Sequence, residues 1–367
     1  MENPLSHFAM LTDPRVERTR EHLLEDVLLI TIAAVLCGAD TWNDIESYGE
    51  TKQRWLETFL KLPGGIPRHD TFNRVFSALD PEELERCFVA WVSRVAKLSA
   101  GEVVSIDGKA LRGSRQRGKK AIVHMVSAWA SENRLVLGQR KVDDKSNEIT
   151  AIPKLLEVLA VQGCLITVDA MGCQKNIATK VREKQADYIL AVKENQGELL
   201  AGIRDSFRFL PAASTSQQVD AGHGRVETRT CTVIHDLSMI EKAQEWAGLH
   251  SLVRLEAERY IKTTGQTERE IRYYISSSSA HAEGINRAVR QHWGIENSLH
   301  WVLDVAFSED HSRKRAGHAA QNFSLITRIA LNLLKRDTLK RSIKGKRLKA
   351  GWDNAYLSSI LKKMEPI

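Results

Sequence analysis

Two short apolar runs that each end at an aspartate are the feature that most restricts the fold of this chain. Asp107 follows the run at 103–106, and Asp169 follows the run at 165–168. Short apolar runs rich in valine and isoleucine are typical of buried strands. Side chains at the ends of such strands gather at one edge of a sheet, where sites form in α/β folds. The two aspartates therefore predict an acidic site at a sheet edge.

The segments around the two aspartates predict a mixed sheet with helices on both faces. The expected elements, in chain order, are strands at 103–107, 121–129 and 135–142, a helix at 149–161, a strand at 165–169, a helix at 175–185, a strand at 188–192 and a helix at 194–209. Three antiparallel strands followed by strand–helix–strand crossovers have the order of the ribonuclease-H-like fold. We therefore predict an α/β protein of that class.

A third acidic residue, Glu296, lies in a segment at 282–303 that is expected to form one long helix. Carboxylates gathered at one point repel each other, so they need a cation to be stable. Mg²⁺ prefers such oxygen ligands and supports phosphoryl transfer. Asp107, Asp169 and Glu296 together predict a metal-dependent enzyme that acts on a nucleic-acid backbone, although each acid alone could be a turn or cap residue.

Other residues near Glu296 leave alternatives open. Asp304, Glu309 and Asp310 are rival third carboxylates, and Asp304 could instead support the site from behind. His292, Glu296 and His300 are spaced four apart and share a helix face, so they could hold zinc. The HExxH order is absent, which favours partly buried packing for the two imidazoles.

The excess of positive charge is concentrated near the C-terminus. The net charge is +7, and residues 335–349 contain eight basic residues and one aspartate. A basic cluster suits phosphate binding, and a solvated tail is the alternative. Five scattered cysteines without a CxxC pair indicate a reducing compartment. No apolar stretch reaches the about 20 residues that span a bilayer, so we expect a cytoplasmic protein without membrane contact.

Basic and polar residues outside the acidic trio are candidate DNA contacts. The turn at 63–67 and the short helix at 70–76 are compatible with a helix-turn-helix-like DNA reader, and an all-helical packing domain is the alternative. Residues that follow the predicted strands or the acidic helix could contact phosphate, although solvated turns and cross-strand ion pairs explain them equally well. These candidates are Lys109, Arg112, Lys193, Asn195, Arg225, Arg313, Lys314 and Arg315.

Longer ordered motifs occur along nearly the full length. They are Asp13-Pro14-Arg15, the segments 38–42 and 65–72, Ile106-Asp107-Gly108-Lys109, and the segments 168–174, 191–196, 223–225 and 292–301. In these motifs the chain resembles bacterial insertion-sequence transposases of the DDE class, specifically the H-repeat-associated group linked to Rhs elements.

The resemblance implies that Asp107, Asp169 and Glu296 form a catalytic triad that holds two Mg²⁺ ions, for which Mn²⁺ can substitute. It also implies binding of double-stranded DNA, as terminal inverted repeats and as target, by a homodimer. The broader superfamily has arginine four residues before the glutamate and lysine seven after it. This chain has His292 and Leu303 at these two positions, so the DNA-binding roles of that arginine and lysine are not assigned to them. The candidates for supporting the metal ligands are His292, Asn297, His300 and Asp304.

Under this interpretation the chain divides into five parts. They are a helical N-terminal domain at 1–97, the first part of the catalytic core at 98–210, a β-rich insertion at 211–277 with strands at 225–234, 251–259 and 268–276, the second part of the core at 278–336, and a basic C-terminal tail at 337–367. A metal-dependent nuclease that cuts without joining is one alternative function. A DNA-binding remnant without catalytic activity is the other.

Overall fold

The structure is a computed structural model, and it describes residues 6–115, 122–143, 147–222 and 224–365. Two features of the sequence, the predicted start of a strand at Ala121 and the motif residue His223, lie outside these ranges. Among the described residues, no helix combines the length and the apolar character needed to cross a membrane.

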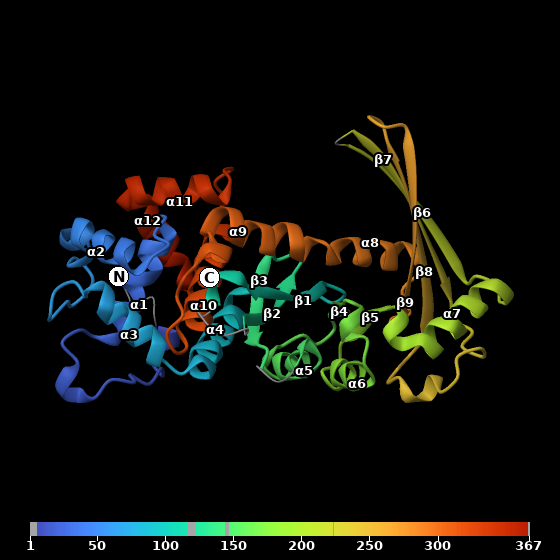
Figure 1. Ribbon diagram of the computed structural model, residues 1–367, viewed down its shortest axis with the longest axis horizontal. Helices are drawn as coiled ribbons and strands as arrows, with labels where there is room; N and C mark the ends of the chain where they lie inside the picture. The colour runs from blue at the N-terminus through green and yellow to red at the C-terminus, as the bar shows by residue number, and fades with distance from the viewer. Residues whose placement is uncertain (1–5, 116–121, 144–146, 223, 366–367) are drawn as a thin grey trace.

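One mixed sheet runs through the molecule (Figure 1). In the described ranges it has nine strands, in the order β3-β2-β1-β4-β5-β9-β8-β7-β6. Their bounds are β1 Val103–Leu111, β2 Val123–Ala130, β3 Leu135–Lys141, β4 Leu165–Val168, β5 Asp187–Val192, β6 Ser214–Gly222, β7 Arg225–Ile234, β8 Ser251–Ile261 and β9 Gln266–Ser276. The chain thus begins its sheet as an antiparallel β1-β2-β3 meander and then adds β4 and β5 in parallel to β1.

The register of β1 against β4 brings the two aspartates side by side. The parallel pairing ends at Ile106 and Val168, so Asp107 and Asp169 are the next residues on two adjacent strands. The prediction that Asp107 ends its strand is wrong, because β2 continues to pair with β1 as far as Leu111. Asp107 therefore lies within a strand, beyond the point where β4 stops.

The β-rich segment extends the same sheet. β9 pairs antiparallel with β5, and β8, β7 and β6 follow as an antiparallel meander. These strands project past the helices as a long ribbon (Figure 1). β6 was missed from the sequence because it is polar and mostly exposed, so it lacks the apolar alternation that identifies a strand.

Helices cover both faces of the sheet. They are α1 Leu24–Leu36, α2 Trp42–Leu56, α3 His69–Ala78, α4 Pro81–Val95, α5 Glu148–Val158, α6 Lys175–Glu183, α7 Gly197–Phe209, α8 Ala282–His292, α9 Trp301–Phe307, α10 Ala319–Lys335, α11 Ile343–Trp352 and α12 Asn354–Leu361. α5 and α6 lie on one face, and α8 and α9 cross the other (Figure 1). The N-terminal helices pack with α10, α11 and α12 at one end of the molecule.

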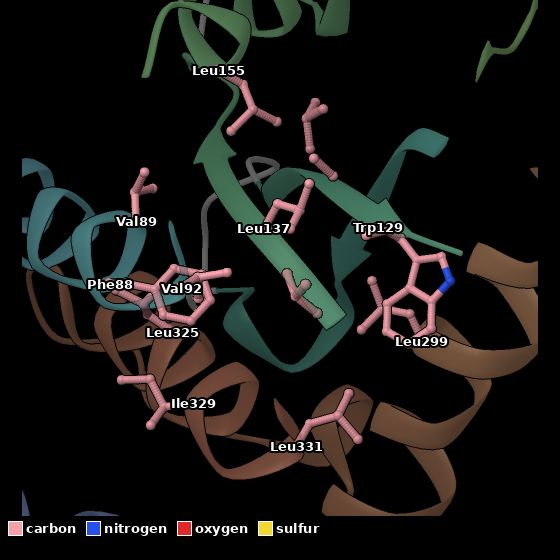
Figure 2. Close-up of a cluster of buried hydrophobic side chains, with 14 of the residues drawn as sticks. Phe88, Val89, Val92, Trp129, Leu137, Leu155, Leu299, Leu325, Ile329 and Leu331 are labelled. Atoms are coloured by element: carbon pink, nitrogen blue, oxygen red, sulfur yellow. The ribbon is translucent and has the colours of Figure 1, made fainter. Parts of the chain in front are cut away.

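A continuous hydrophobic core joins these helices to the sheet. α4 packs on β3 and on α10, and Figure 2 shows Phe88 and Val92 of α4 near Leu137 of β3 and Leu325 of α10. The same cluster of buried residues extends from the N-terminal helices to the C-terminal ones. Through α4, the N-terminal helices therefore anchor β3, the edge strand that pairs with β2.

The basic C-terminal segment is folded and does not form a tail. It contains α11 and α12, and α11 packs against α1 and α10. Arg347 is buried, and its guanidinium donates to the carbonyls of Val35, Ala39 and Ala306 near the ends of α1 and α9. Because the last carbonyls of a helix lack partners within it, this cation satisfies groups from two helices at once. Part of the predicted phosphate-binding charge is thus structural.

Candidate active site: an acidic pocket

Asp107, Asp169 and Glu296 line one pocket of about 260 Å³. Asp107 comes from β1, and Asp169 follows β4 and accepts a hydrogen bond from the backbone amide of Gly172. Glu296 comes from the helical segment that crosses this face of the sheet. The trio predicted from the sequence therefore borders a common space, although 189 residues separate its first and last members.

The helical segment that carries Glu296 is not the single regular helix predicted at 282–303. α8 ends at His292, and a π-helical turn spans Glu296–His300 before α9 begins at Trp301. A π-helical turn holds an extra residue and shifts the side chains that follow it around the helix, and such turns are frequent at functional sites. Glu296 is the first residue of this turn, so the irregularity lies at the proposed catalytic position.

Two contacts fix this helical segment against β1. His300 Nδ1 lies 3.5 Å from a carboxylate oxygen of Asp107, and Lys109 Nζ lies 2.6 Å from an Asp304 oxygen. Asp107 and Lys109 are two residues apart on one strand face, and His300 and Asp304 are four apart on one helix face. The two residues of the strand therefore face the two residues of the helix. Lys109 is almost fully buried, and its ion pair with Asp304 holds the strand and the helix in this alignment.

Burial and repulsion disfavour a charged Asp107. Burial, followed by the charges of Asp169, Glu148 and Glu296, raises the pKa of Asp107 to about 7, against a hydrogen bond from the Gly108 amide that lowers it. His300 beside it is held neutral, because burial and the nearby cations Arg328 and Lys109 lower its pKa to about 3. The neighbouring imidazole thus supplies no compensating charge, and an added cation would relieve the repulsion.

Glu148 is a fourth carboxylate that sequence reasoning missed. It is the first residue of α5, after the Asn147 cap, and burial together with the charge of Asp169 raises its pKa. A Cβ on Gly108 would lie 1.9 Å from Glu148 Oε1, so the glycine of the Ile106-Asp107-Gly108-Lys109 motif leaves space for this carboxylate. Gly108 and Asp107 face opposite sides of β1. Glu148 therefore reaches the acidic group from the face that α5 covers.

The rival carboxylates near Glu296 are engaged elsewhere. Asp304 and Asp310 both contact Lys109, and Asp310 also lies 3.5 Å from Arg112. Glu309 forms a buried ion pair with Arg328. In the described ranges no cation pairs with Glu296, which is exposed at the pocket. Glu296 is therefore the third acid that remains open to a ligand.

The alternative zinc site is not formed. His292 Nδ1 lies 2.9 Å from the Thr167 hydroxyl, whereas His300 faces Asp107, so the two imidazoles are directed to different neighbours. Burial lowers the pKa of His292. His292 supports the end of β4 next to Asp169, and Asn297 lies outside the acidic pocket, where its side chain donates to the Trp293 carbonyl.

The predicted DNA contacts divide into exposed and structural residues. Lys193 lines the acidic pocket and is exposed, and Arg112, Arg225, Arg313 and Arg315 are exposed as well. Asn195 instead donates to the Ala170 carbonyl and so holds the turn after Asp169. Lys314 is buried, 3.6 Å from the centre of the Phe323 ring, with the Trp42 ring also nearby. We therefore leave Lys314 and Lys109 out of the proposed DNA interface.

Arg272 is a second residue that the sequence did not single out. It lines the acidic pocket from β9, forms two hydrogen bonds of 2.7 Å to the Glu270 carboxylate, and lies 4.5 Å from the centre of the Trp293 ring. The sequence pattern could have identified Arg272, because Glu270, Arg272 and Tyr274 are every second residue of the strand predicted at 268–276 and so share one face. All three line the pocket.

The donor set suits a hard divalent cation. Carboxylate oxygens are the ligands that Mg²⁺ prefers, and the raised pKa of Asp107 reflects burial and a repulsion that a cation would relieve. Among the described residues, no three His, Cys, Asp or Glu side chains already lie close enough to hold a metal ion. Ligation by all three acids therefore requires their carboxylates to turn toward a common point in the pocket.

Comparison with known proteins identifies the family. The family model described as Transposase DDE domain matches residues 98–333, and the model described as DDE_Tnp_1-associated matches residues 5–92. The fold, the acidic pocket and these matches define a DDE-domain protein. The chain belongs to the DDE transposase family, in the H-repeat-associated group.

Several relatives from Escherichia coli support this assignment. "Putative transposase YncI" of the O157:H7 strain is 41% identical over 98% of this chain and 95% of its own length. "H repeat-associated putative transposase YhhI" of strain K12 is 40% identical over 97% of both chains. "Inactive transposase YbfQ" of strain K12 is 42% identical over 20% of this chain and 87% of its own length. The family thus includes a member named as inactive, so catalysis has to be tested for each chain.

Glu148→Gln is expected to weaken the binding of Mg²⁺ to the acidic pocket by about 10- to 100-fold in a metal titration, the usual effect of losing a group that supports metal ligands. Glu157→Gln, at an exposed position of the same helix, is the matched control and should leave the metal dependence unchanged. Gly108→Ala should resemble Glu148→Gln, because its methyl group displaces the carboxylate. An unchanged metal requirement in Glu148→Gln would show that this carboxylate does not support the site.

Proposed function

We propose that the chain is a DNA transposase that cleaves the ends of its insertion sequence and joins them to target DNA. One observation carries the proposal. In a chain of the DDE transposase family, Asp107, Asp169 and Glu296 border a single pocket, and the rival carboxylates are occupied by cations. The sheet order β3-β2-β1-β4-β5 further supports a core of the ribonuclease-H-like class.

In this proposal the three acids hold Mg²⁺, two ions being expected and Mn²⁺ a substitute. Bound metal would supply stabilisation of the charge on the attacking and leaving oxygens of the phosphodiester. Adjacent strands fix Asp107 and Asp169, and the π-helical turn presents Glu296 from the opposite side. His300 and the Lys109–Asp304 pair keep that turn in register with β1.

The proposed DNA path continues from the acidic pocket into a groove of about 510 Å³ between β7–β9 and α8. Arg272 and Trp293 line both spaces. Arg225 adds exposed positive charge along the groove, and Arg290 lies beside it in an exposed ion pair with Asp220. Phosphate contacts of this kind should make DNA binding weaken steeply as the salt concentration rises.

The N-terminal helices are the proposed reader of the terminal inverted repeats. Phe72, Val75 and Phe76 bury one face of α3, whereas Arg68 and Arg74 are exposed. Glu46 accepts hydrogen bonds from the backbone amide and the ring of His69 and so fixes the start of this helix. We further propose that a homodimer pairs two DNA ends, and that the protein acts in the cytoplasm, where bacterial DNA lies.

The test is Mg²⁺-dependent cleavage and strand transfer on duplex DNA that carries the flanking ends of the element. Wild-type protein should cut at the ends, and a pre-cut 3′-hydroxyl end should be joined to a plasmid. Cutting without joining would favour the alternative nuclease. Binding of authentic ends without cutting, in both Mg²⁺ and Mn²⁺, would favour the DNA-binding remnant.

A further inference from the structure

A second cavity, of about 580 Å³, lies on the far side of α9 from Asp107. α9, the segment between α10 and α11, and the start of α11 form its wall, and α9 and α11 are in contact. We term it the cationic pocket and define it by Arg134, Trp301, Lys335, Lys340, Arg341 and Lys344. It contains none of the three acids of the acidic pocket.

The positive charge of the cationic pocket is largely uncompensated. Lys346 also lines it, and Asp337 is the one carboxylate among the lining residues. Asp337 is engaged, because it accepts a hydrogen bond from the Tyr356 hydroxyl and lies 3.4 Å from Lys346 Nζ. In the described ranges no carboxylate pairs with Lys340, Arg341 or Lys344, all of which are exposed. Cations gathered in this way repel each other, and a bound anion would relieve that repulsion.

Two further features point to a phosphate ligand. Burial is the main cause that lowers the pKa of Lys335 to about 8, and the neighbouring cations Arg134 and Lys346 add to the shift. Lys344 lies in the first turn of α11, which has no acidic residue. The start of a helix favours negative charge and normally disfavours a lysine. A phosphate group at this position would be stabilised by the helix and by the lysine together.

Trp301 gives the cationic pocket an aromatic rim. Its side chain is 61% exposed, which is unusual for tryptophan, and Val305 one turn later is 50% exposed. Positive charge combined with an exposed aromatic ring is typical of surfaces that track a nucleic-acid strand, since bases and sugars pack on the ring while cations hold the phosphates. Trp301 follows Glu296 by five residues, or about 7 Å along the helix axis.

We propose that the cationic pocket binds the backbone of the DNA strand that runs beside the acidic pocket, with Trp301 packed against a sugar or base of that strand. The proposal rests on the proposed function and deepens it, because it assigns the DNA path on the second side of α9. The groove between β7–β9 and α8, which Arg225 lines, would hold DNA on the β-strand side, and the cationic pocket would hold it on the α11 side.

The test uses DNA binding in the Asp107→Asn background, so that the readout does not depend on cleavage. In a plot of the logarithm of the binding constant against the logarithm of salt concentration, the variant Lys340→Ala/Arg341→Ala/Lys344→Ala should have a slope that is shallower by about three units. Each of the three cations would otherwise neutralise one phosphate. Trp301→Ala should weaken binding about 10-fold, as expected when a stacking platform is removed. The matched control Lys154→Gln/Lys175→Gln/Lys180→Gln removes three cations from α5 and α6, on the other face of the sheet, and should leave the slope almost unchanged.

The failures of the two proposals are distinguishable. If wild-type protein cuts no DNA but the triple alanine variant loses affinity, the cationic pocket still binds DNA and only the catalytic proposal fails. An unchanged salt slope in a folded triple variant would overturn the inference while leaving cleavage intact. Inorganic tripolyphosphate tests for a small free anion as ligand. If it binds the wild-type pocket while the triple variant keeps full DNA affinity, the pocket belongs to that anion and the inference is overturned.

Discussion

Asp107→Asn is expected to reduce Mg²⁺-dependent cleavage and strand transfer by at least about 10³-fold, because a metal ligand contributes several kcal/mol to transition-state stabilisation. The substitution keeps the shape of the side chain and removes its charge, so the strand and its contact with His300 should persist. DNA binding measured in the absence of metal should change little. The measurement is the single-turnover rate on end-containing DNA, compared with the affinity for the same DNA.

The same substitution should stabilise the metal-free protein. The carboxyl of Asp107 has a pKa of about 7 in the folded chain, against an ordinary value of 3.8. Between these values the unfolded chain releases a proton that the folded chain retains, so the free energy of unfolding falls as the pH rises from about 4 to about 7. Above that range the wild type carries a penalty of about 2–4 kcal/mol that asparagine lacks.

Thermal unfolding in the presence of a chelator checks this result. The melting temperature of Asp107→Asn should exceed that of wild type by several degrees at about pH 8, and by much less at about pH 4. Asp205→Asn, at an exposed position of α7, is the control and should not shift either curve. A variant that loses activity together with stability would indicate a structural role for Asp107 in place of the proposed catalytic one.

The order of strands and helices could be predicted from the sequence because it depends on local patterns. Apolar runs such as 103–106 and 165–168 identify buried strands, and helical spacing identifies α5 and α6. The pairing of β9 with β5 could not be predicted in this way, because it joins segments about 80 residues apart. β6 was missed for a different reason, since its side chains are mainly polar and exposed.

The shared pocket of the acidic trio follows from local patterns, since apolar runs precede both aspartates and a helical pattern surrounds Glu296, although Asp107 lies within its strand and Glu296 begins a π-helical turn. The roles of Lys109, Asn195 and Lys314 could not be predicted, since a cation or an amide after a strand has the same local signature whether it faces DNA or a buried partner. Only the fold brings Asp304 to Lys109 and Phe323 to Lys314. Glu148 was missed because its proximity to Asp169 arises from the path of α5, which the sequence does not encode locally.

Glu309→Ala is expected to lower the free energy of unfolding by about 3–5 kcal/mol, because it leaves a buried cation without its counter-ion. Arg328 is fully buried, and Glu309 is almost so. Without Glu309, the acceptors left to the guanidinium in the described part of the chain are the Ser324 carbonyl and the Thr327 hydroxyl. Urea unfolding of the full chain measures the loss. Glu258→Ala, which breaks the exposed pair with Arg269, should cost less than about 1 kcal/mol.

A double variant separates the ion pair from the volume of the side chains. Glu309→Leu combined with Arg328→Met removes both charges and should recover most of the stability, because an apolar pair of similar size avoids the desolvation of two ions. If the double variant is as unstable as Glu309→Ala, packing around the pair, and not its charge, determines the loss. The pair also bears on the acidic pocket, since Arg328 contributes to the low pKa of His300 and Glu309 precedes the Asp310 that contacts Lys109. Because burial is the main cause of the low pKa of His300, the rescued double variant should keep this imidazole neutral beside Asp107 and should retain most of the proposed cleavage activity.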